Sequence, residues 1–331
     1  MSYEEEKLNF IPHSSYLLTP TTMNKKNNKK TDSKFLNYEN LDKIGEIPVY
    51  YGFTPMKSPT ISKTDLDAAY NNSLAVPQSA EIVQSWVRGS KDAKNTLIGQ
   101  CDIPYGIGSF QKFDYFPGKR GSPLVVFLHG GFWQMRSKDD FTFIVPALIR
   151  AGLSVAMLGY TLAPYAKMEG IIADVRSGIH AIHAYHHEQE SILSGVWLLG
   201  WSAGAHLVSM ALDEDAVIGG TAISGIYDLE PMRFCYINDK LQLEEAASLK
   251  NSPIRLLQSM HKPLDIFVGS AELPEMQRQS SDFADYRKSL GSLGEFENIA
   301  NKNHYTILDE LTMSAGLIIK SMIKRLGGLA V

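Results

Sequence analysis

The chain has 331 residues, of which 44% are hydrophobic, and a formal net charge of −4. It is long enough to bury a sizeable core, and α/β folds of this size often form one domain. The small charge gives no electrostatic reason to expect a nucleic acid or a membrane surface as a partner. No stretch approaches the ~18 consecutive apolar residues of a membrane span, and the N-terminus lacks the layout of a signal peptide, so we expect a cytoplasmic protein.

The N-terminal residues differ in composition from the rest of the chain. Residues 1–45 are polar, and MNKKNNKKTDSK (23–34) is basic with few apolar side chains. Such a composition cannot bury enough apolar surface to offset the entropy of ordering. We therefore expect 1–45 to be a mobile N-terminal extension and 46–331 to form a single domain.

The two cysteines, Cys101 and Cys235, are far apart and match no metal-binding or redox spacing. A disulfide framework would need more cysteines at regular spacing. We expect two buried thiols.

Helix and strand signals begin after residue 60. One helix-like segment starts near Thr64, and a second covers 79–97 with Ser79 as its expected N-cap. Residues 109–116 alternate as a hairpin strand would, and 117–123 supply turn residues.

From residue 123 onward, short apolar runs alternate with helix-like segments. Such runs, apolar throughout, predict strands buried on both faces, and therefore an α/β fold with a mostly parallel central sheet flanked by helices. The apolar runs are 123–131, 153–160, 195–202, 217–228, 262–270 and 294–301, and the helix-like segments are 141–152, 169–190, 203–215 and 307–326.

The sequence GWSAG places Ser202 where the third of these runs gives way to a helix. A G-x-S-x-G turn between strand and helix holds a serine hydroxyl exposed at the carboxyl edge of the sheet, where active sites gather. The small residues Gly200, Ala203 and Gly204 let such a crowded turn form. An ordinary tight turn is the alternative, but the strand–turn–helix context favours a nucleophile.

A serine needs a base, and in this arrangement the chain order is serine, acid, histidine. After the run 262–270 the only histidine is His304, which lies between the last strand run and the last helix. We expect His304 to be the general base, on a loop fixed by Thr306 and Asp309 as helix caps.

The acid is expected just beyond the run 262–270, where a carboxylate can orient the imidazole. Glu272 lies at that point and is the favoured residue. Glu275 is a nearby competitor, whereas Asp265 falls near the start of the strand and is too early to reach the carboxyl edge.

Acyl transfer also needs donors for the developing oxyanion, and LHGGFWQ (128–134) follows the first buried strand. Its glycines let the backbone approach a substrate. We expect the amides of Gly131 and Phe132, with Gly130 as a further candidate, to act together with that of Ala203. A simple glycine turn is the alternative for this motif taken alone.

These motifs, with SGIYDLEPM (224–232), AELPEMQRQSSDF (271–283) and a late NHY, resemble the kynurenine formamidases (arylformamidases) of the α/β-hydrolase superfamily. The resemblance spans about 60 to 320. It implies the α/β-hydrolase fold and hydrolysis of an N-formyl arylamine such as N-formylkynurenine, with no metal or organic cofactor. It also implies Ser202 as nucleophile, Glu272 as acid and His304 as base.

The chain departs from the family's pattern at three positions. The family often has histidine where this chain has Trp201, aspartate where it has Glu272, and an acidic residue where it has Asn303. We expect Trp201 to reshape one side of the substrate pocket.

Other aromatic and histidine residues need an interpretation as well. Aromatic side chains near strand ends could line a pocket for an aromatic substrate; these are Phe132, Trp133, Tyr160, Trp201 and Tyr227.

His183 and His187 are i,i+4 neighbours in a group with His180 and His186, but no third ligand is evident and we expect no metal site. We expect His206 to pack or hydrogen-bond, and His129 to brace the oxyanion loop.

Three functions therefore stay open. The first is an arylformamidase-like serine hydrolase that works through an acyl-serine intermediate. The second is a carboxylesterase acting on small or aromatic esters with the same machinery, and the third is a hydrolase-fold protein that binds a small molecule without turnover. A small-molecule substrate with an aromatic group is the expected partner, and a homodimer is left open.

Overall fold

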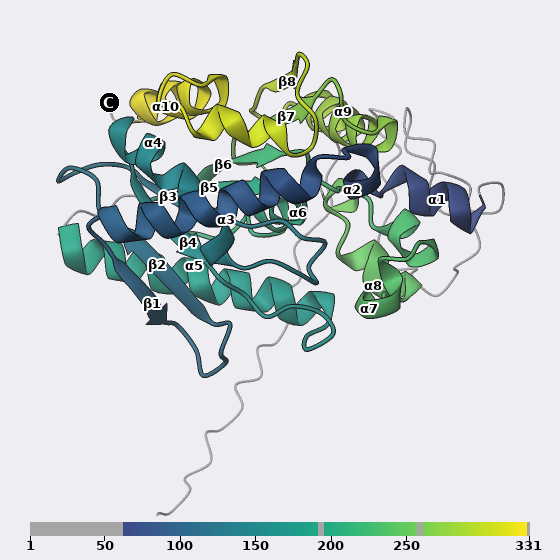
Figure 1. The fold of residues 1–331 in the computed structure, drawn as a ribbon, viewed down its shortest axis with the longest axis horizontal. Coiled ribbons are helices and arrows are strands. Elements are labelled where there is room, and N and C mark those ends of the chain that lie inside the picture. Colours follow the sequence, from purple (N-terminus) through teal and green to yellow (C-terminus); the bar gives the residue numbers. More distant parts are fainter. Residues whose placement is uncertain (1–61, 191–194, 257–260, 330–331) are drawn as a thin grey trace, which may run out of the picture. The chain divides into compact units, whose positions relative to one another are not determined.

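The computed structural model describes residues 62–190, 195–256 and 261–329 (Figure 1). All of them belong to one unit, residues 50–331. The expected N-terminal extension, residues 1–45, lies outside the described residues. None of the described helices is long and apolar enough to cross a membrane.

The described strands form one sheet in the order β1-β2-β4-β3-β5-β6-β7-β8. β1 and β2 pair antiparallel, β2 pairs antiparallel with β4, and every pairing from β4 to β8 is parallel, which confirms the mostly parallel sheet. The strands are β1 (Gln100–Pro104), β2 (Lys112–Phe116), β3 (Leu124–Leu128), β4 (Ser154–Leu158), β5 (Val196–Trp201), β6 (Val217–Ile223), β7 (Leu264–Gly269) and β8 (Phe296–Ile299).

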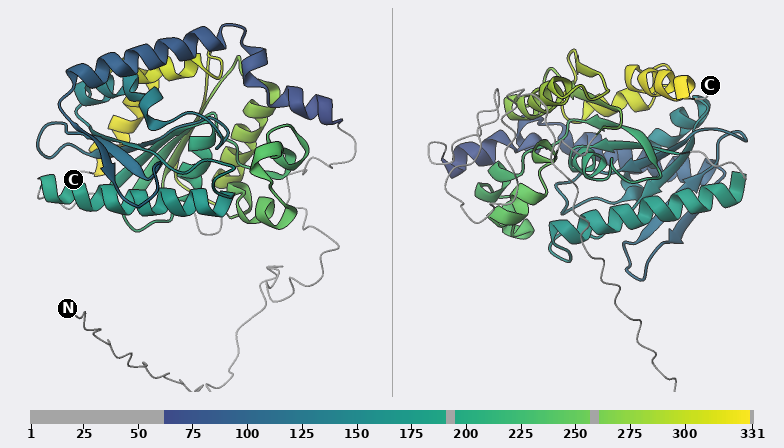
Figure 2. Two further views of the ribbon diagram at one scale, coloured as in Figure 1. Left: turned by 60° about the horizontal axis from the view of Figure 1, so that its bottom comes forward. Right: turned by 180° about the vertical axis from the view of Figure 1, so that it is seen from behind.

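Helices cover both faces of this sheet (Figure 2). The α-helices are α1 (Lys63–Ala69), α2 (Asn72–Ala75), α3 (Ser79–Thr96), α4 (Val145–Arg150), α5 (Met168–Glu190), α6 (Ala203–Met210), α7 (Asn238–Leu241), α8 (Glu245–Lys250), α9 (Pro274–Ser289) and α10 (Leu317–Leu329). Short 3₁₀ helices are η1 (Lys138–Asp140), η2 (Thr142–Ile144), η3 (Glu230–Phe234), η4 (Pro253–Arg255) and η6 (Thr306–Leu311).

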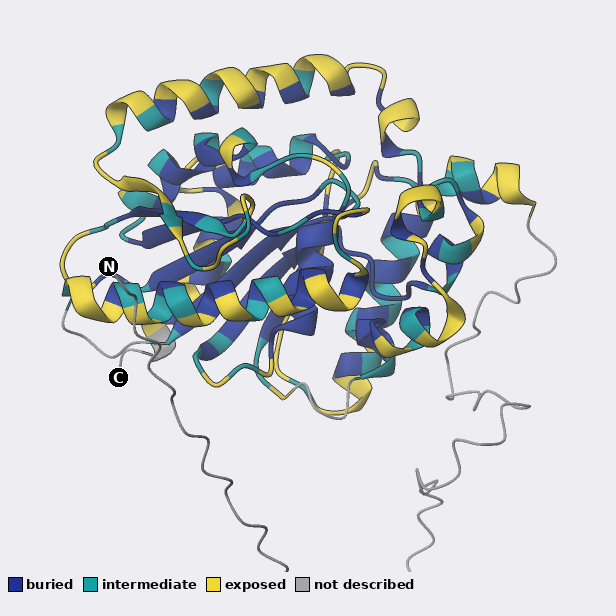
Figure 3. Ribbon diagram, turned by 90° about the horizontal axis from the view of Figure 1, so that it is seen from below, coloured by how far each residue is buried: buried dark blue, intermediate teal, exposed yellow. Residues whose placement is uncertain are grey.

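The side chains of β3 show why the strand is apolar throughout. Leu124, Val126 and Leu128 belong to a core cluster formed with α5, α6 and α9, whereas Val125 and Phe127 belong to a second cluster formed with α3, α4 and α10. Successive side chains of a strand point to opposite faces, so both faces of the sheet are buried. Figure 3 shows the central strands as buried and the outer face of α3 as largely exposed.

Several local expectations need correction. Ser79 is the first residue of α3 rather than its cap; its hydroxyl donates to the carbonyl of Ser73. The expected helix 307–326 is η6 followed by α10, because the Glu310 side chain accepts from the amide of Leu317 and starts a new helix there. Cys235 is buried as expected, but Cys101 lies on the edge strand β1 and is exposed.

Candidate active site

Ser202 forms the sharp turn that joins β5 to α6. Its backbone has φ 58° and ψ −121°, a conformation that is strained for any residue other than glycine. The Ser202 amide donates to the carbonyl of Ile223 at 2.8 Å, which ties the turn to β6. A Cβ at Gly204 would lie 1.9 Å from the backbone oxygen of Leu128, so only glycine fits there. The small residues of GWSAG therefore have the steric role expected for a strained serine turn.

His304 lies on the loop between β8 and η6, next to Ser202. Its Nε2 atom is 3.1 Å from Ser202 Oγ. The Asn303 side chain accepts from the amides of Tyr305 and Thr306, both at 2.9 Å, and therefore shapes the loop.

The expected cap by Thr306 and Asp309 differs from the observed arrangement. Thr306 Oγ1 accepts from the amide of Asn303 at 3.0 Å, while Asp309 pairs with Lys302 at 3.1 Å. A short asparagine side chain can accept hydrogen bonds from nearby backbone amides. Asn303, and not Thr306 or Asp309, therefore accepts from the amides at the start of η6.

Glu272 follows β7 and faces the other side of the imidazole. Its Oε2 atom is 2.7 Å from His304 Nδ1. The second oxygen, Oε1, accepts from Ser224 Oγ at 2.5 Å and from the amide of Gly269 at 2.8 Å. Both carboxylate oxygens are thus held, and Oε2 is fixed toward the imidazole.

Ser224 is a further residue of this site that the sequence alone did not indicate. It comes directly after β6 and has φ 52°, an uncommon value for a residue other than glycine. Its place at a strand end within SGIYDLEPM was the only signal available. The contact with Glu272 spans 48 positions of the chain and leaves no local pattern.

The two competing carboxylates are engaged elsewhere. Glu275 accepts from the hydroxyl of Tyr70 at 2.6 Å and pairs with Arg278. Asp265 pairs with Arg325 at 2.8 Å and accepts from the hydroxyl of Ser321. Only Glu272 contacts the imidazole among the three candidates.

The three side chains are almost fully buried. Ser202, His304 and Glu272 are 2%, 3% and 6% exposed. Charge interactions are stronger away from bulk water, so an imidazolium formed on His304 would be stabilised by Glu272 more than at a surface.

The loop after β3 is strained and lies close to the nucleophile. Gly131, Phe132 and Trp133 have φ values of 118°, 50° and 59°. A Cβ at Gly130 would lie 2.9 Å from the Cβ of Ser202. Within residues 62–190, 195–256 and 261–329, the backbone hydrogen bonds include no acceptor for the amides of Gly131, Phe132 and Ala203. These N–H groups are free to donate to a substrate.

Two neutral histidines hold this loop in place. Trp133 Nε1 donates to His206 Nδ1 at 3.2 Å, and His206 Nε2 in turn donates to the carbonyl of Asn251 at 2.8 Å. His129 Nδ1 donates to the carbonyl of Gly130 at 2.8 Å. Burial lowers the pKa of both His129 and His206 to about 4. Both rings therefore serve as neutral hydrogen-bonding groups near pH 7.

Four of the five aromatic residues expected to line the substrate site lie in packed protein. Trp133, Tyr160 and Tyr227 are 0%, 1% and 0% exposed, and Trp201 is 4% exposed. Tyr160 donates to the backbone oxygen of His129, and Tyr227 stacks on Phe283 at 4.2 Å. Their burial is comparable with that of Ser202, His304 and Glu272, and substrate contact by these residues stays a prediction. Phe132 differs because it is only partly buried and lies edge-on to Tyr236.

The histidine group on α5 takes part in protein contacts. His180 lies 2.6 Å from Glu214, and His186 lies 2.8 Å from the hydroxyl of Tyr115. Among the described residues, no group of three or more His, Cys, Asp and Glu side chains could hold a metal ion.

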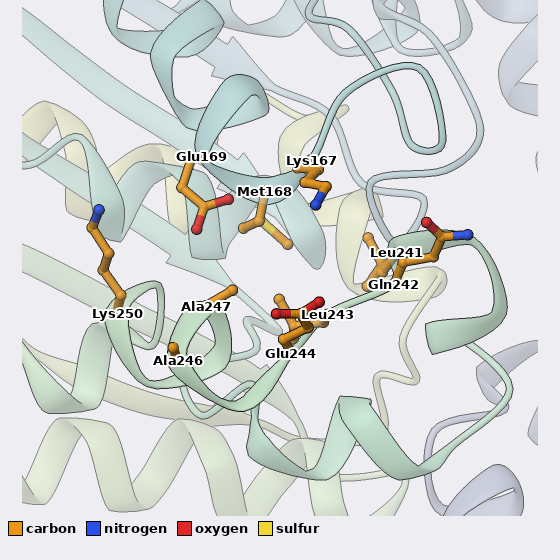
Figure 4. Close-up of a pocket in the computed structure, with 10 residues that line it drawn as sticks. All are labelled: Lys167, Met168, Glu169, Leu241, Gln242, Leu243, Glu244, Ala246, Ala247 and Lys250. Atoms are coloured by element: carbon orange, nitrogen blue, oxygen red, sulfur yellow. The ribbon is translucent and has the colours of Figure 1, made fainter.

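A cavity of about 340 Å³ lies outside the Ser202–His304–Glu272 group (Figure 4). It lies between the start of α5 and the segment from the end of α7 through α8. Lysine and glutamate side chains both line it, so it presents no single sign of charge. The lining residues are Lys167, Met168, Glu169, Leu241, Gln242, Leu243, Glu244, Ala246, Ala247 and Lys250.

The mostly parallel sheet with a strained serine turn at a strand end defines an α/β hydrolase. Solved structures agree with this class. A candidate thioesterase from Silicibacter sp. matches with a TM-score of 0.70 and 25% identity, over 77% of this chain and 98% of that one. A hyperthermophilic esterase from Pyrobaculum calidifontis matches with a TM-score of 0.62 and 16% identity, over 78% and 94%, and supports the fold alone.

Sequence relatives identify the family. The kynurenine formamidase of Danio rerio is 31% identical over 291 residues, which cover 81% of this chain and 98% of that protein. The kynurenine formamidase of Drosophila melanogaster is 28% identical over 69% of this chain and 84% of that protein. The family profile BD-FAE matches residues 115–220. The chain belongs to the kynurenine formamidase family and is a hydrolase.

Proposed function

We propose that the protein hydrolyses an N-formyl arylamine of the N-formylkynurenine type through an acyl-serine intermediate. The observation that carries this proposal is the hydrogen-bonded array Ser202–His304–Glu272, with distances of 3.1 Å and 2.7 Å, in a chain of the kynurenine formamidase family. The substrate class is inferred from the names of the relatives, and nucleophilic attack by serine is inferred from the hydrogen-bonded array.

In the first step, Ser202 Oγ attacks the formyl carbon while His304 Nε2 takes the hydroxyl proton. This requires the tautomer of His304 that carries its proton on Nδ1 and donates it to Glu272 Oε2. Glu272 stays ionised and stabilises the imidazolium that forms. The Oε1 contacts with Ser224 and Gly269 keep the carboxylate from turning away.

The carbonyl oxygen becomes negative in the tetrahedral intermediate. The unengaged amides of Gly131, Phe132 and Ala203 are the proposed donors, with Gly130 as a further candidate. Loss of one such donor typically costs about 2.7–4 kcal/mol of transition-state stabilisation. Positive φ values at three successive loop residues fix these amides before substrate arrives, so little reorganisation is needed.

As this tetrahedral intermediate collapses, His304 gives its proton to the leaving arylamine nitrogen and the C–N bond breaks. A water molecule then loses a proton to His304 and attacks the formyl ester of Ser202. The ester C–O bond breaks, formate leaves and the serine hydroxyl is restored. Every proton passes through His304 Nε2, so the cycle needs no metal or organic cofactor.

A carboxylesterase is the second candidate, because esterases share this fold and because the same residues would cleave a small or aromatic ester. A binding protein without turnover is disfavoured. The Ser202 hydroxyl is within hydrogen-bond distance of the His304 imidazole, and the other ring nitrogen is within hydrogen-bond distance of the Glu272 carboxylate. An aromatic small molecule as substrate, a homodimeric assembly and a cytoplasmic location stay predictions.

A direct comparison of substrates separates the two enzyme candidates. N-formylkynurenine and a short-chain aryl ester are assayed side by side with the wild-type protein. A higher kcat/KM for the formamide supports the arylformamidase. Ester cleavage without formamide cleavage would contradict it and leave the carboxylesterase.

A further inference from the structure

The short segment from Tyr70 to Ser73 joins the parts of the chain that carry Glu272 and His304. At one end, the Tyr70 hydroxyl donates to Glu275 at 2.6 Å and accepts from Gln279 Nε2 at 2.8 Å. Both partners lie on α9, which begins two residues after Glu272. Tyr70 is fully buried, so this end of the segment is anchored.

At the other end, the segment reaches the histidine loop. The hydroxyls of Ser73 and Tyr305 lie 2.8 Å apart. Tyr305 directly follows His304, and their rings are edge-on with centroids 5.8 Å apart. Residues 70–73 therefore cross from the acid side of the site to its base side, and Figure 1 shows α1 and α2 at the end of the fold where α9 lies.

Asn72 lies in the middle of this crossing and has an unusual environment. It is 3% exposed, and within the part of the chain that the structure describes neither its side-chain oxygen nor its side-chain nitrogen has a hydrogen-bond partner. Burial of an amide without partners destabilises the folded protein. Buried polar groups in native proteins are almost always paired, and an unpaired one calls for a ligand, a water or a functional reason.

We propose that Asn72 binds the polar substituent of the arylamine leaving group, and so selects substrates that carry one. This inference rests on the proposed arylformamidase function. The formyl end of the substrate is taken by Ser202 and the loop amides, so the partner of Asn72 is a part of the substrate that does not react.

The chemistry of a carboxamide fits such a partner. Its NH₂ group donates and its oxygen accepts, without charge. The amino-acid group of N-formylkynurenine can pair with both atoms of the carboxamide, because its carboxylate accepts hydrogen bonds and its ammonium group donates them. N-formylaniline has the same scissile bond but no such group, so it should be insensitive to Asn72.

The test compares Asn72→Leu with wild type on both substrates. Leucine has a similar volume and removes the unpaired polar atoms. We expect KM for N-formylkynurenine to rise about tenfold, with less than about a twofold change for N-formylaniline, and a melting temperature equal to or above that of wild type. Asn72→Ala, which cannot clash, should give the same KM pattern if the leucine variant folds poorly.

Asn71 offers a matched control one residue away. Its side chain accepts from the amide of Leu74 at 3.0 Å and caps α2. Asn71→Ala should lower stability slightly and leave the ratio of the two KM values unchanged.

Two results would overturn the inference in different ways. Unchanged KM for N-formylkynurenine in both Asn72 variants, with normal wild-type turnover, would refute the role of Asn72 alone. A wild-type protein that cleaves the aryl ester but neither formamide would refute the proposed function and this inference with it.

Discussion

The indole Nε1–H of Trp201 donates a 2.9 Å hydrogen bond to the backbone carbonyl oxygen of His304. The two rings also contact each other, with centroids 4.9 Å apart. Trp201 directly precedes Ser202, so a single side chain links the nucleophile turn to the loop of the base. Trp201 thus contacts both the backbone and the ring of His304, the proposed base.

Replacing Trp201 by Phe should lower kcat with a smaller effect on KM. The ring volume is largely kept, but the hydrogen bond that fixes His304 is lost, and a small displacement of a base costs about tenfold or more in rate. Trp197→Phe is the control, because Trp197 lies on the same strand and its Nε1 donates to Thr221 Oγ1 at 2.9 Å, away from the site. Equal losses of kcat in the two variants would contradict a positioning role for Trp201.

Ser224→Ala should reduce kcat/KM by about tenfold while the protein stays folded. The hydroxyl holds Glu272 Oε1 at 2.5 Å, and a hydrogen bond to a charged group is worth about 1.5–3 kcal/mol. Ser280→Ala is a useful comparison, because Ser280 is equally buried and its hydroxyl has no hydrogen-bond partner among the described residues. Steady-state kinetics on an aryl ester or a formamide would measure both. Unaltered kinetics in Ser224→Ala would show that Gly269 alone suffices to orient the carboxylate.

Trp133→Phe should lower kcat through the oxyanion loop. The indole nitrogen anchors this loop to His206 on α6, and Trp133 has a strained positive φ that needs such support. We expect about a tenfold loss of kcat with little change in KM, because donor alignment matters most in the transition state. A change in KM alone would point instead to a role in ground-state binding.

The stability of the protein should fall with acidification below pH 6.5. Burial lowers the pKa of His129 and His206 to about 4, from an ordinary value of 6.5. Between these values the unfolded chain binds more protons than the folded chain, so stability is fully present above pH 6.5 and is lost as the pH falls toward 4. Each ring contributes up to about 1.4 kcal/mol per pH unit.

Chemical denaturation of wild type and His206→Gln across this range would check the pH prediction. The variant keeps a polar side chain but no longer titrates there. Its free energy of unfolding should depend less steeply on pH than that of wild type. Parallel pH dependences would show that His206 does not titrate as its burial indicates.

The parts of the site that could be predicted from the sequence depend on short local patterns. The serine turn follows from glycines at fixed offsets between a strand and a helix. His304 follows from chain order, because only one histidine comes after β7 in the sequence. These residues meet because the carboxyl ends of parallel strands share one edge of the sheet.

Other features depend on long-range packing that no local pattern encodes. The Ser224–Glu272 and Trp201–His304 contacts join residues 48 and 103 positions apart. The packing of the aromatic side chains at strand ends was also unpredictable: Trp133, Tyr160 and Tyr227 belong to one core cluster and Trp201 to the other. Strand β1 was missed because its residues are largely exposed at an edge and show no apolar periodicity.

Ser202 is the proposed nucleophile that cleaves an N-formyl arylamine, and the kcat/KM of Ser202→Ala for N-formylkynurenine tests this role. Ser209→Ala is the matched control, because Ser209 lies on α6 with its hydroxyl bonded to the carbonyl of Ala205. We expect wild type and Ser209→Ala to turn over the formamide at similar rates, and Ser202→Ala to lose at least about 10⁴-fold. Formamide hydrolysis that survives in Ser202→Ala would show that Ser202 is not the nucleophile.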